Sequence, residues 1–225
     1  MSLLQPVEFS PVAVLFDMDG LMIESERALL ECWREASTEL QLELDDALWL
    51  SFVGHSDRVC RDLLRERLPE AQVQALLAGL QVRYDARVEA GLPIKAGVFE
   101  LLALLHERGI PRAVGTSTRR PRALQKLELA GLLPHFDTIV TGSDVEHSKP
   151  APDIYLLAAK QLGVAPERCI VLEDSAAGVR AALAAGMTPI QVPDLVAPDD
   201  EVRALGHRIV DSLLHARALI EPALG

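Results

Sequence analysis

The sequence has few cysteines and no long apolar stretch. Its 225 residues include three cysteines, Cys32, Cys60 and Cys169, which are widely spaced and form no CxxC pair. This pattern excludes a disulfide framework and a cysteine-rich metal site, and it favours reduced thiols and a cytoplasmic location. No run of about 18 apolar residues occurs, so we expect neither a transmembrane helix nor a membrane partner. The apolar stretch before Phe16 lacks a positively charged start, which argues against an export signal.

Positive charge is also scarce. Lysine and arginine together number 22 against 33 aspartates and glutamates, which gives a formal net charge of −11. Without a basic block the chain cannot neutralise a phosphate backbone, so nucleic acid is excluded as an expected partner. At 49% hydrophobic, 225 residues suit one large domain or one domain that carries a smaller insert.

Short β-rich runs alternate with amphipathic helical stretches along most of the chain. The predicted strands lie at residues 11–16, 112–117, 138–142, 169–173 and 188–192, with a weaker one at 208–210. The predicted helices lie at about 97–108, 119–131, 151–163 and 175–186. Such alternation predicts an α/β fold of the doubly wound, Rossmann-like type, in which helices cover both faces of a parallel sheet.

Residues 22–94 interrupt this alternation with helical periodicity and no convincing strand. We therefore expect a catalytic core formed by residues 1–21 and 95–225, with an all-helical cap domain at 22–94. Because the insert leaves after the first strand, it should lie over the carboxyl ends of the strands, where open α/β sheets bind ligands. Trp33 and Trp49 have helical neighbours and are expected to pack inside this cap.

Pairs of acidic residues follow two of the predicted strands. Asp17 and Asp19 come after the first run, and residues two apart in an extended segment face the same way. Gly20 then permits a sharp turn. Glu173 and Asp174 end a later run. Either pair alone is more typical of a solvated loop, but four carboxylates at one sheet edge repel one another unless protons or a cation compensate them, and oxygen ligands suit Mg²⁺.

Two further segments supply groups that can bind an anion. The run at 112–117 ends in small hydroxyl residues, including Thr116 and Ser117, directly before a helical stretch whose N–H groups can hold a phosphate. Lys149 adds a fixed positive charge, and Pro150 and Pro152, which bracket the entry to the next helical stretch, stiffen the loop that carries it. Together with the acids, these segments predict a site for a phosphorylated ligand.

In this order and spacing, the segments resemble the motifs of the haloacid dehalogenase (HAD) superfamily of aspartate-nucleophile phosphohydrolases. The matching residues are Asp17, Met18, Asp19 and Gly20 for the first motif, Thr116 for the second, Lys149 for the third, and Glu173 with Asp174 for the fourth. The resemblance covers the core from about residue 11 to 193. The helical insert resembles the cap of the β-phosphoglucomutase-like and phosphoglycolate-phosphatase-like branch.

The resemblance implies a role for each of these residues. Asp17 would be the nucleophile and Asp19 the general acid and base, while Thr116 and Lys149 hold the phosphoryl oxygens. Mg²⁺ would be bound by Asp17, the backbone carbonyl of Asp19 and Asp174, and Glu173 would be either a water-mediated ligand or a group that orients Lys149. The expected substrate contacts are Gly20, Thr116, Ser117 and Lys149 in the core and, with less support, His55, Arg58 and Arg119.

Three activities fit such a site. The first is a Mg²⁺-dependent phosphatase acting on a small phosphorylated metabolite, namely a sugar, polyol or nucleoside monophosphate. The second is a phosphosugar mutase, but the mutases use cap lysines, and no lysine occurs between Met22 and Ile94. The third is a catalytically inactive metal-binding module. Dehalogenation is disfavoured because the dehalogenases lack an aspartate at the place of Asp19. We expect a monomer, although a dimer through the cap is an alternative.

Overall fold

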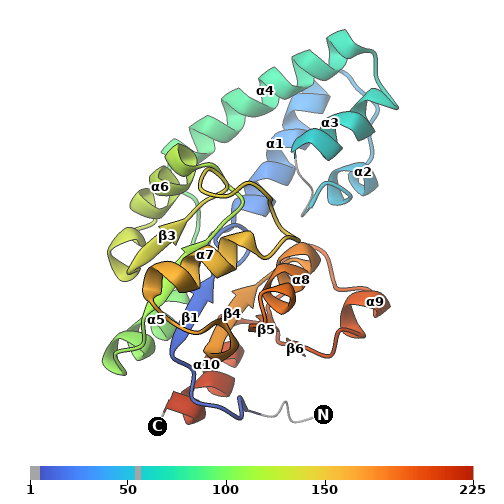
Figure 1. Cartoon of the computed structure of the whole chain (residues 1–225). Helices are drawn as coiled ribbons and strands as arrows, with labels where there is room; N and C mark the ends of the chain where they lie inside the picture. The colour runs from blue at the N-terminus through green and yellow to red at the C-terminus, as the bar shows by residue number, and fades with distance from the viewer. Residues whose placement is uncertain (1–5, 54–56, 225) are drawn as a thin grey trace.

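The protein has an α/β lobe and a helical lobe that projects from it (Figure 1). The computed structural model describes residues 6–53 and 57–224, with only the backbone described for residues 57 and 58. The strands are β1 Ala13–Phe16, β2 Arg112–Gly115, β3 Thr138–Val140, β4 Cys169–Glu173, β5 Thr188–Gln191 and β6 Arg208–Ile209. The helices are α1 Ser25–Glu39, α2 Asp46–Leu50, α3 Asp57–Arg65, α4 Glu70–Glu89, α5 Val98–Glu107, α6 Arg120–Leu129, α7 Asp153–Leu162, α8 Ala176–Ala184, α9 Asp200–Arg203 and α10 Leu213–Ile220, with short 3-10 helices at Leu133–His135, Pro166–Arg168 and Glu221–Leu224.

The six strands form one parallel sheet in the order β3-β2-β1-β4-β5-β6. β1 is central, with Leu15 opposite Ala113 of β2 on one side and Val171 of β4 on the other. Its four residues are all buried, as expected for a strand that is covered on both faces. The predicted doubly wound parallel sheet is therefore confirmed.

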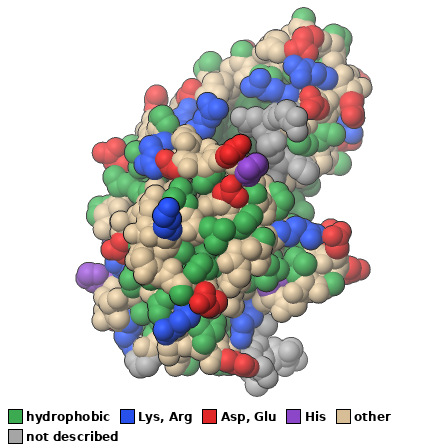
Figure 2. Space-filling view, in the orientation of Figure 1, with side chains coloured by type: hydrophobic (Ala, Val, Ile, Leu, Met, Phe, Trp, Pro, Cys, Tyr) green, Lys and Arg blue, Asp and Glu red, His purple; other side chains and the backbone are tan. Residues whose placement is uncertain are grey.

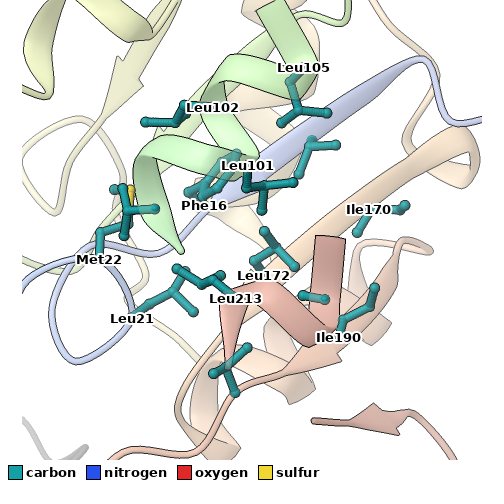
Figure 3. Close-up of a cluster of buried hydrophobic side chains, with 14 of the residues drawn as sticks. Phe16, Leu21, Met22, Leu101, Leu102, Leu105, Ile170, Leu172, Ile190 and Leu213 are labelled. Atoms are coloured by element: carbon teal, nitrogen blue, oxygen red, sulfur yellow. The ribbon is translucent and has the colours of Figure 1, made fainter. Parts of the chain in front are cut away.

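Alternate residues of β1 point into two separate hydrophobic clusters. Val14 and Phe16 pack with α5, α6 and α10 on one face, where Figure 3 shows Phe16 among leucines of α5 and α10. Ala13 and Leu15 pack with α7 and α8 on the other face. This period of two, repeated in β4, is what requires helices on both sides of the sheet. The clusters hold β1 and β4 rigidly and so define where their carboxyl ends lie.

The predicted elements of the core are present, with small shifts at their ends, but the C-terminal helices α9 and α10 were not predicted. α10 buries Leu213, Ala216, Leu219 and Ile220 on one face. Its N-cap, Ser212, accepts a hydrogen bond from the backbone N–H of His215 at 3.3 Å. Both the apolar spacing and the capping serine were visible in the sequence as helix signals.

The insert after β1 consists of α1–α4 and has a hydrophobic cluster of its own. Trp33 and Trp49 stack with their ring centroids 5.4 Å apart, and Phe52 contacts both rings edge-on. The expectation that the tryptophans fill the cap interior is therefore confirmed. The insert's two ends run side by side, because Ile23 and Ile94 form a β-bridge. These paired segments connect the cap to the core.

In the described part of the chain, no helix is both long and apolar enough to cross a membrane. On the face shown in Figure 2, acidic and basic side chains are interspersed over both lobes.

Candidate active site

The site lies where β1, β2 and β4 end beside one another. Asp17 follows β1 directly, Thr116 follows β2, and Asp174 follows β4. The backbone N–H of Asp17 donates to the carbonyl of Leu172 at 3.0 Å, which continues the parallel pairing into the site. Because parallel strands end at the same edge, residues more than 150 positions apart in the sequence meet here.

Asp17 and Lys149 form a buried ion pair. The Lys149 Nζ lies 2.5 Å from Asp17 Oδ1 and 2.6 Å from Glu173 Oε1, so one ammonium bridges two carboxylates. The Lys149 side chain is 6% exposed, and Glu173 is completely buried. At such burial each charge requires its partner, since an uncompensated one would be strongly destabilising. The third-motif lysine is therefore beside the first-motif aspartate, as the sequence predicts.

Glu173 is fully occupied by hydrogen-bond donors. Its Oε1 accepts from Lys149 and, at 2.6 Å, from the hydroxyl of Tyr155. Its Oε2 accepts from both the backbone N–H and the hydroxyl of Ser175, at 3.2 and 3.0 Å. The Tyr155 ring also lies under the Lys149 ammonium, 4.8 Å from its Nζ. Of the two roles expected for Glu173, these contacts favour orienting Lys149.

Three carboxylates form a cluster that could hold a metal ion. One oxygen each from Asp17, Glu173 and Asp174 lies within 4.8 Å of the others. The Asp174 side chain accepts no hydrogen bond from the described residues, and only its backbone carbonyl accepts one, from Gln191. A Cβ at Gly20 would lie only 2.2 Å from Asp174 Oδ2, so the glycine leaves room for this carboxylate. An all-oxygen set of hard ligands fits Mg²⁺. With Glu173 already engaged, Asp17 and Asp174 are the residues that would bind the ion.

The ionisation of this cluster also indicates a cation. Burial raises the pKa of Asp17 to about 8, against the opposing effect of Lys149, and Glu173 and Asp19 raise it further. Burial, followed by the charges of Glu173 and Asp17, raises the pKa of Asp174 well above its ordinary value. A divalent ion beside these groups would favour their charged forms. The carboxylates therefore fit the metal that the sequence predicts.

Asp19 lies in a separate network and is held by three side chains. Its Oδ1 accepts hydrogen bonds from the Ser25 hydroxyl at 2.6 Å and from the Lys126 ammonium at 2.7 Å. Its Oδ2 accepts from the Thr118 hydroxyl at 2.6 Å. Burial raises the pKa of Asp19, but the Lys126 charge and these three donors outweigh it and lower the pKa below its ordinary value. The two aspartates of the first motif are thus shifted in opposite directions, Asp17 upward and Asp19 downward.

The remaining predicted residues divide into three groups. Thr116 is buried beside the strand ends, and its hydroxyl accepts a hydrogen bond from the backbone N–H of Thr118 at 3.1 Å. Ser117 and Arg119 are exposed where the chain enters α6. His55 lies outside the described residues, and of Arg58 only the backbone, in α3, is described.

Sequence reasoning missed three residues that hold the site together: Ser25, Lys126 and Tyr155. Thr118 belongs to the hydroxyl segment that the sequence indicates for anion binding, but its contact with Asp19 comes from the structure. Lys126 carried a signal too, because the chain has only four lysines and this one falls on the apolar face of a predicted helix. Ser25 and Tyr155 carried no such signal, because nothing in their local sequence distinguishes them from other polar residues on helices.

This geometry defines a hydrolase class: a doubly wound sheet whose central strand ends in a buried aspartate, with a lysine and further carboxylates around it and a helical insert after that strand. A haloacid dehalogenase-like hydrolase family model matches residues 12–186. The chain belongs to this family.

Relatives and solved structures agree with this assignment. Hexitol phosphatase A of Escherichia coli is 34% identical over 202 residues, which cover 90% of this chain and 89% of the relative. A phosphorylated carbohydrates phosphatase of Thermotoga maritima is 32% identical, covering 79% of this chain and 83% of that protein. Among solved structures, a HAD family hydrolase from Deinococcus radiodurans, crystallised with bound phosphate and sodium, is 34% identical with a TM-score of 0.81 and covers 96% of this chain and 97% of its own.

Proposed function

We propose that this protein is a Mg²⁺-dependent phosphatase that hydrolyses a small phosphorylated sugar or sugar alcohol. The observation that carries the proposal is the Asp17 carboxylate, which follows the central strand, pairs with Lys149 at 2.5 Å and lies in a cluster with Asp174. A nucleophile, a fixed cation and a metal-binding acid are thereby in one place. That combination suits attack on a phosphoryl group, whose oxygens carry negative charge.

In the first half of the reaction, an Asp17 oxygen attacks phosphorus. A new oxygen–phosphorus bond forms, the bond to the substrate's alkoxide breaks, and the alkoxide takes a proton from Asp19. The product is an aspartyl-phosphate, which divides one difficult displacement into two easier ones. Lys149 neutralises negative charge on the phosphoryl oxygens, and the hydroxyl and backbone N–H groups that follow β2 orient them.

In the second half, water attacks the phosphorus of the aspartyl-phosphate. Asp19 accepts a proton from that water, the bond between phosphorus and Asp17 breaks, and inorganic phosphate leaves. The donors around Asp19 stabilise its carboxylate, which is the form that this step requires. When bound by Asp17 and Asp174, Mg²⁺ would supply positive charge that lets an anionic nucleophile approach an anionic substrate.

The proposed substrate class rests on the relatives and on the entrance to the site. One relative is named for hexitol phosphates and another for phosphorylated carbohydrates. Ser117 and Arg119 lie exposed at the start of α6, next to the predicted phosphate-binding loop, and we assign them to substrate contact from the core side. Arg58 and His55 are assigned to contact from the cap side on the sequence pattern alone.

The test is a screen for phosphate release from hexitol phosphates, sugar phosphates and nucleoside monophosphates, with Mg²⁺ and with EDTA. Glucose 1-phosphate with a bisphosphate primer is included to detect a mutase. We expect Mg²⁺-dependent release from a sugar or hexitol phosphate and none from the Asp17→Asn variant, which retains the shape of the side chain. Full activity of that variant would contradict the nucleophile assignment, and isomer interconversion without net phosphate release would establish a mutase instead.

A further inference from the structure

A second buried lysine, Lys126, holds the carboxylate of Asp19. Its Nζ lies 2.7 Å from Asp19 Oδ1, and the lysine side chain is 4% exposed. Of the chain's four lysines, Lys126 and Lys149 thus contact the two aspartates of the first motif, one each. A buried ion pair is weak evidence of stabilisation, because removing two charges from water offsets most of their attraction. The pair therefore calls for an explanation other than stability.

The contacts of Asp19 restrict its orientation. Ser25, at the start of α1, and Lys126, on α6, both donate to Oδ1. Thr118, in the segment between β2 and α6, donates to Oδ2. With donors on both oxygens, the carboxylate plane is defined. Lys126 is the only charged member of this set, so it contributes the strongest of the three interactions.

Lys126 is also contacted from the cap. The ring of Tyr84, near the end of the long cap helix α4, lies 5.1 Å from the Lys126 Nζ, which is within cation–π range. The neighbouring residue Asp85 pairs with Arg122, one turn before Lys126 on α6. Figure 1 shows the end of α4 beside α6. The cap therefore touches the core at the residue that holds Asp19.

We propose that Lys126 is a positioning residue for Asp19, and that Tyr84 makes this positioning depend on the docking of cap helix α4. The proposal rests on the acid and base role of Asp19 in the proposed function. When α4 is docked, the Tyr84 ring covers the ammonium and excludes water, which strengthens its attraction to the carboxylate. When α4 withdraws, water solvates Lys126 and the hold on Asp19 weakens. The core is then competent for proton transfer only with the cap in place.

The experiment compares two substrates that differ in their need for a proton. The alkoxide leaving from glycerol 2-phosphate must be protonated, whereas p-nitrophenolate departs from p-nitrophenyl phosphate without a proton. Because both substrates give the same aspartyl-phosphate, the comparison uses kcat/KM, which reports the step that releases the alcohol. We expect Lys126→Met to lower kcat/KM on glycerol 2-phosphate about 100-fold and kcat/KM on p-nitrophenyl phosphate by less than about tenfold. Lys160→Met, which removes an exposed lysine of α7, is the matched control and should leave both rates unchanged.

A double variant tests whether Lys126 acts through Asp19. In an Asp19→Asn background, Lys126→Met should lower kcat no further, because residues that act as a unit are not additive. An equal loss in both backgrounds, or an equal loss of kcat/KM on both substrates, would overturn the positioning role. If Asp19→Asn itself hydrolyses glycerol 2-phosphate at the normal rate, the proposed function is wrong instead.

The role of the cap is tested at Tyr84, which also covers the case in which Lys126→Met does not fold. Tyr84→Leu removes the ring and should lower kcat/KM on glycerol 2-phosphate about tenfold while lowering kcat/KM on p-nitrophenyl phosphate less. Tyr84→Phe keeps a ring over the ammonium and should cause a smaller loss than Tyr84→Leu. Equal losses of kcat/KM on both substrates in the leucine variant would show that the cap does not act through Lys126.

Discussion

Replacing Lys149 by methionine should destabilise the metal-free protein more than any loss of packing would explain. Methionine retains an apolar stem of similar length, so the variant creates little cavity. It does remove the ammonium that lies 2.5 Å from Asp17 and 2.6 Å from Glu173. Breaking a buried ion pair from one side costs about 3–5 kcal/mol, because the remaining charge is left uncompensated. For a chain of this size the loss corresponds to a fall in Tm of roughly 10 °C.

The loss should depend on pH and on metal. Without Lys149, the carboxylates of Asp17 and Glu173 can relieve their repulsion by taking up a proton, so the destabilisation should be smaller at low pH than at high pH. A bound cation compensates the same charges, so saturating Mg²⁺ should stabilise the variant more than the wild type. Binding at 100 times Kd contributes about 2.7 kcal/mol.

The measurement is urea unfolding at acidic and alkaline pH, with EDTA and with Mg²⁺. Lys160→Met again serves as the control, since it removes an exposed lysine that no described carboxylate contacts. A Lys149→Met variant within about 1 kcal/mol of wild type at alkaline pH in EDTA would show that the buried carboxylates do not need this partner. Lys149 would then not be the group that compensates the charges of Asp17 and Glu173.

Three further outcomes follow from the site. A Cβ at Gly178 would lie 1.8 Å from the Glu173 carboxyl carbon. Overpacking in Gly178→Ala should therefore lower the free energy of unfolding by about 1–3 kcal/mol, which exceeds the roughly 1 kcal/mol that alanine contributes through helix propensity. Urea unfolding measures the difference. Burial raises the pKa of Asp17 from 3.8 to about 8. Between these pH values the folded protein binds a proton that the unfolded chain does not, so the Tm in EDTA should fall as the pH rises through this range. Asp17→Asn should remove that part of the fall. Mg²⁺ should raise the Tm of the wild type in a concentration-dependent way, and Asp174→Asn should abolish the rise; an unchanged rise in that variant would exclude Asp174 as a ligand.

Local signals in the sequence were sufficient for the architecture of the core. β1 is short, apolar and followed by acids, and its alternation between two buried faces follows from the period of two in any strand. Lys149 was also predictable, because it lies in a loop directly before Pro150 and Pro152 and supplies a positive charge that an anion site requires. α10 was predictable as well, since its capping serine and apolar spacing are both present in the sequence.

The role of Glu173 required the structure. Its sequence neighbours do not show whether it binds metal or orients a lysine. The hydroxyl of Tyr155, on a helix that follows the Lys149 loop, occupies one of its oxygens, and Ser175 occupies the other. The role of Glu173 depends on which hydrogen-bond donors the packed helices bring close to it, and no local sequence pattern encodes that packing.

What the sequence by itself determined is the sheet, the inserted helices and the residues that we propose to react with phosphate, because strand periodicity and short motifs are properties of neighbouring residues. Only the tertiary structure decided how the two aspartates of the first motif differ. Lys126 lies 107 positions after Asp19 and meets it only when α6 packs against the sheet, and Tyr84 meets Lys126 only when the cap docks. Burial then decides how strongly these charges act, because a charge excluded from water interacts far more strongly than one in solution.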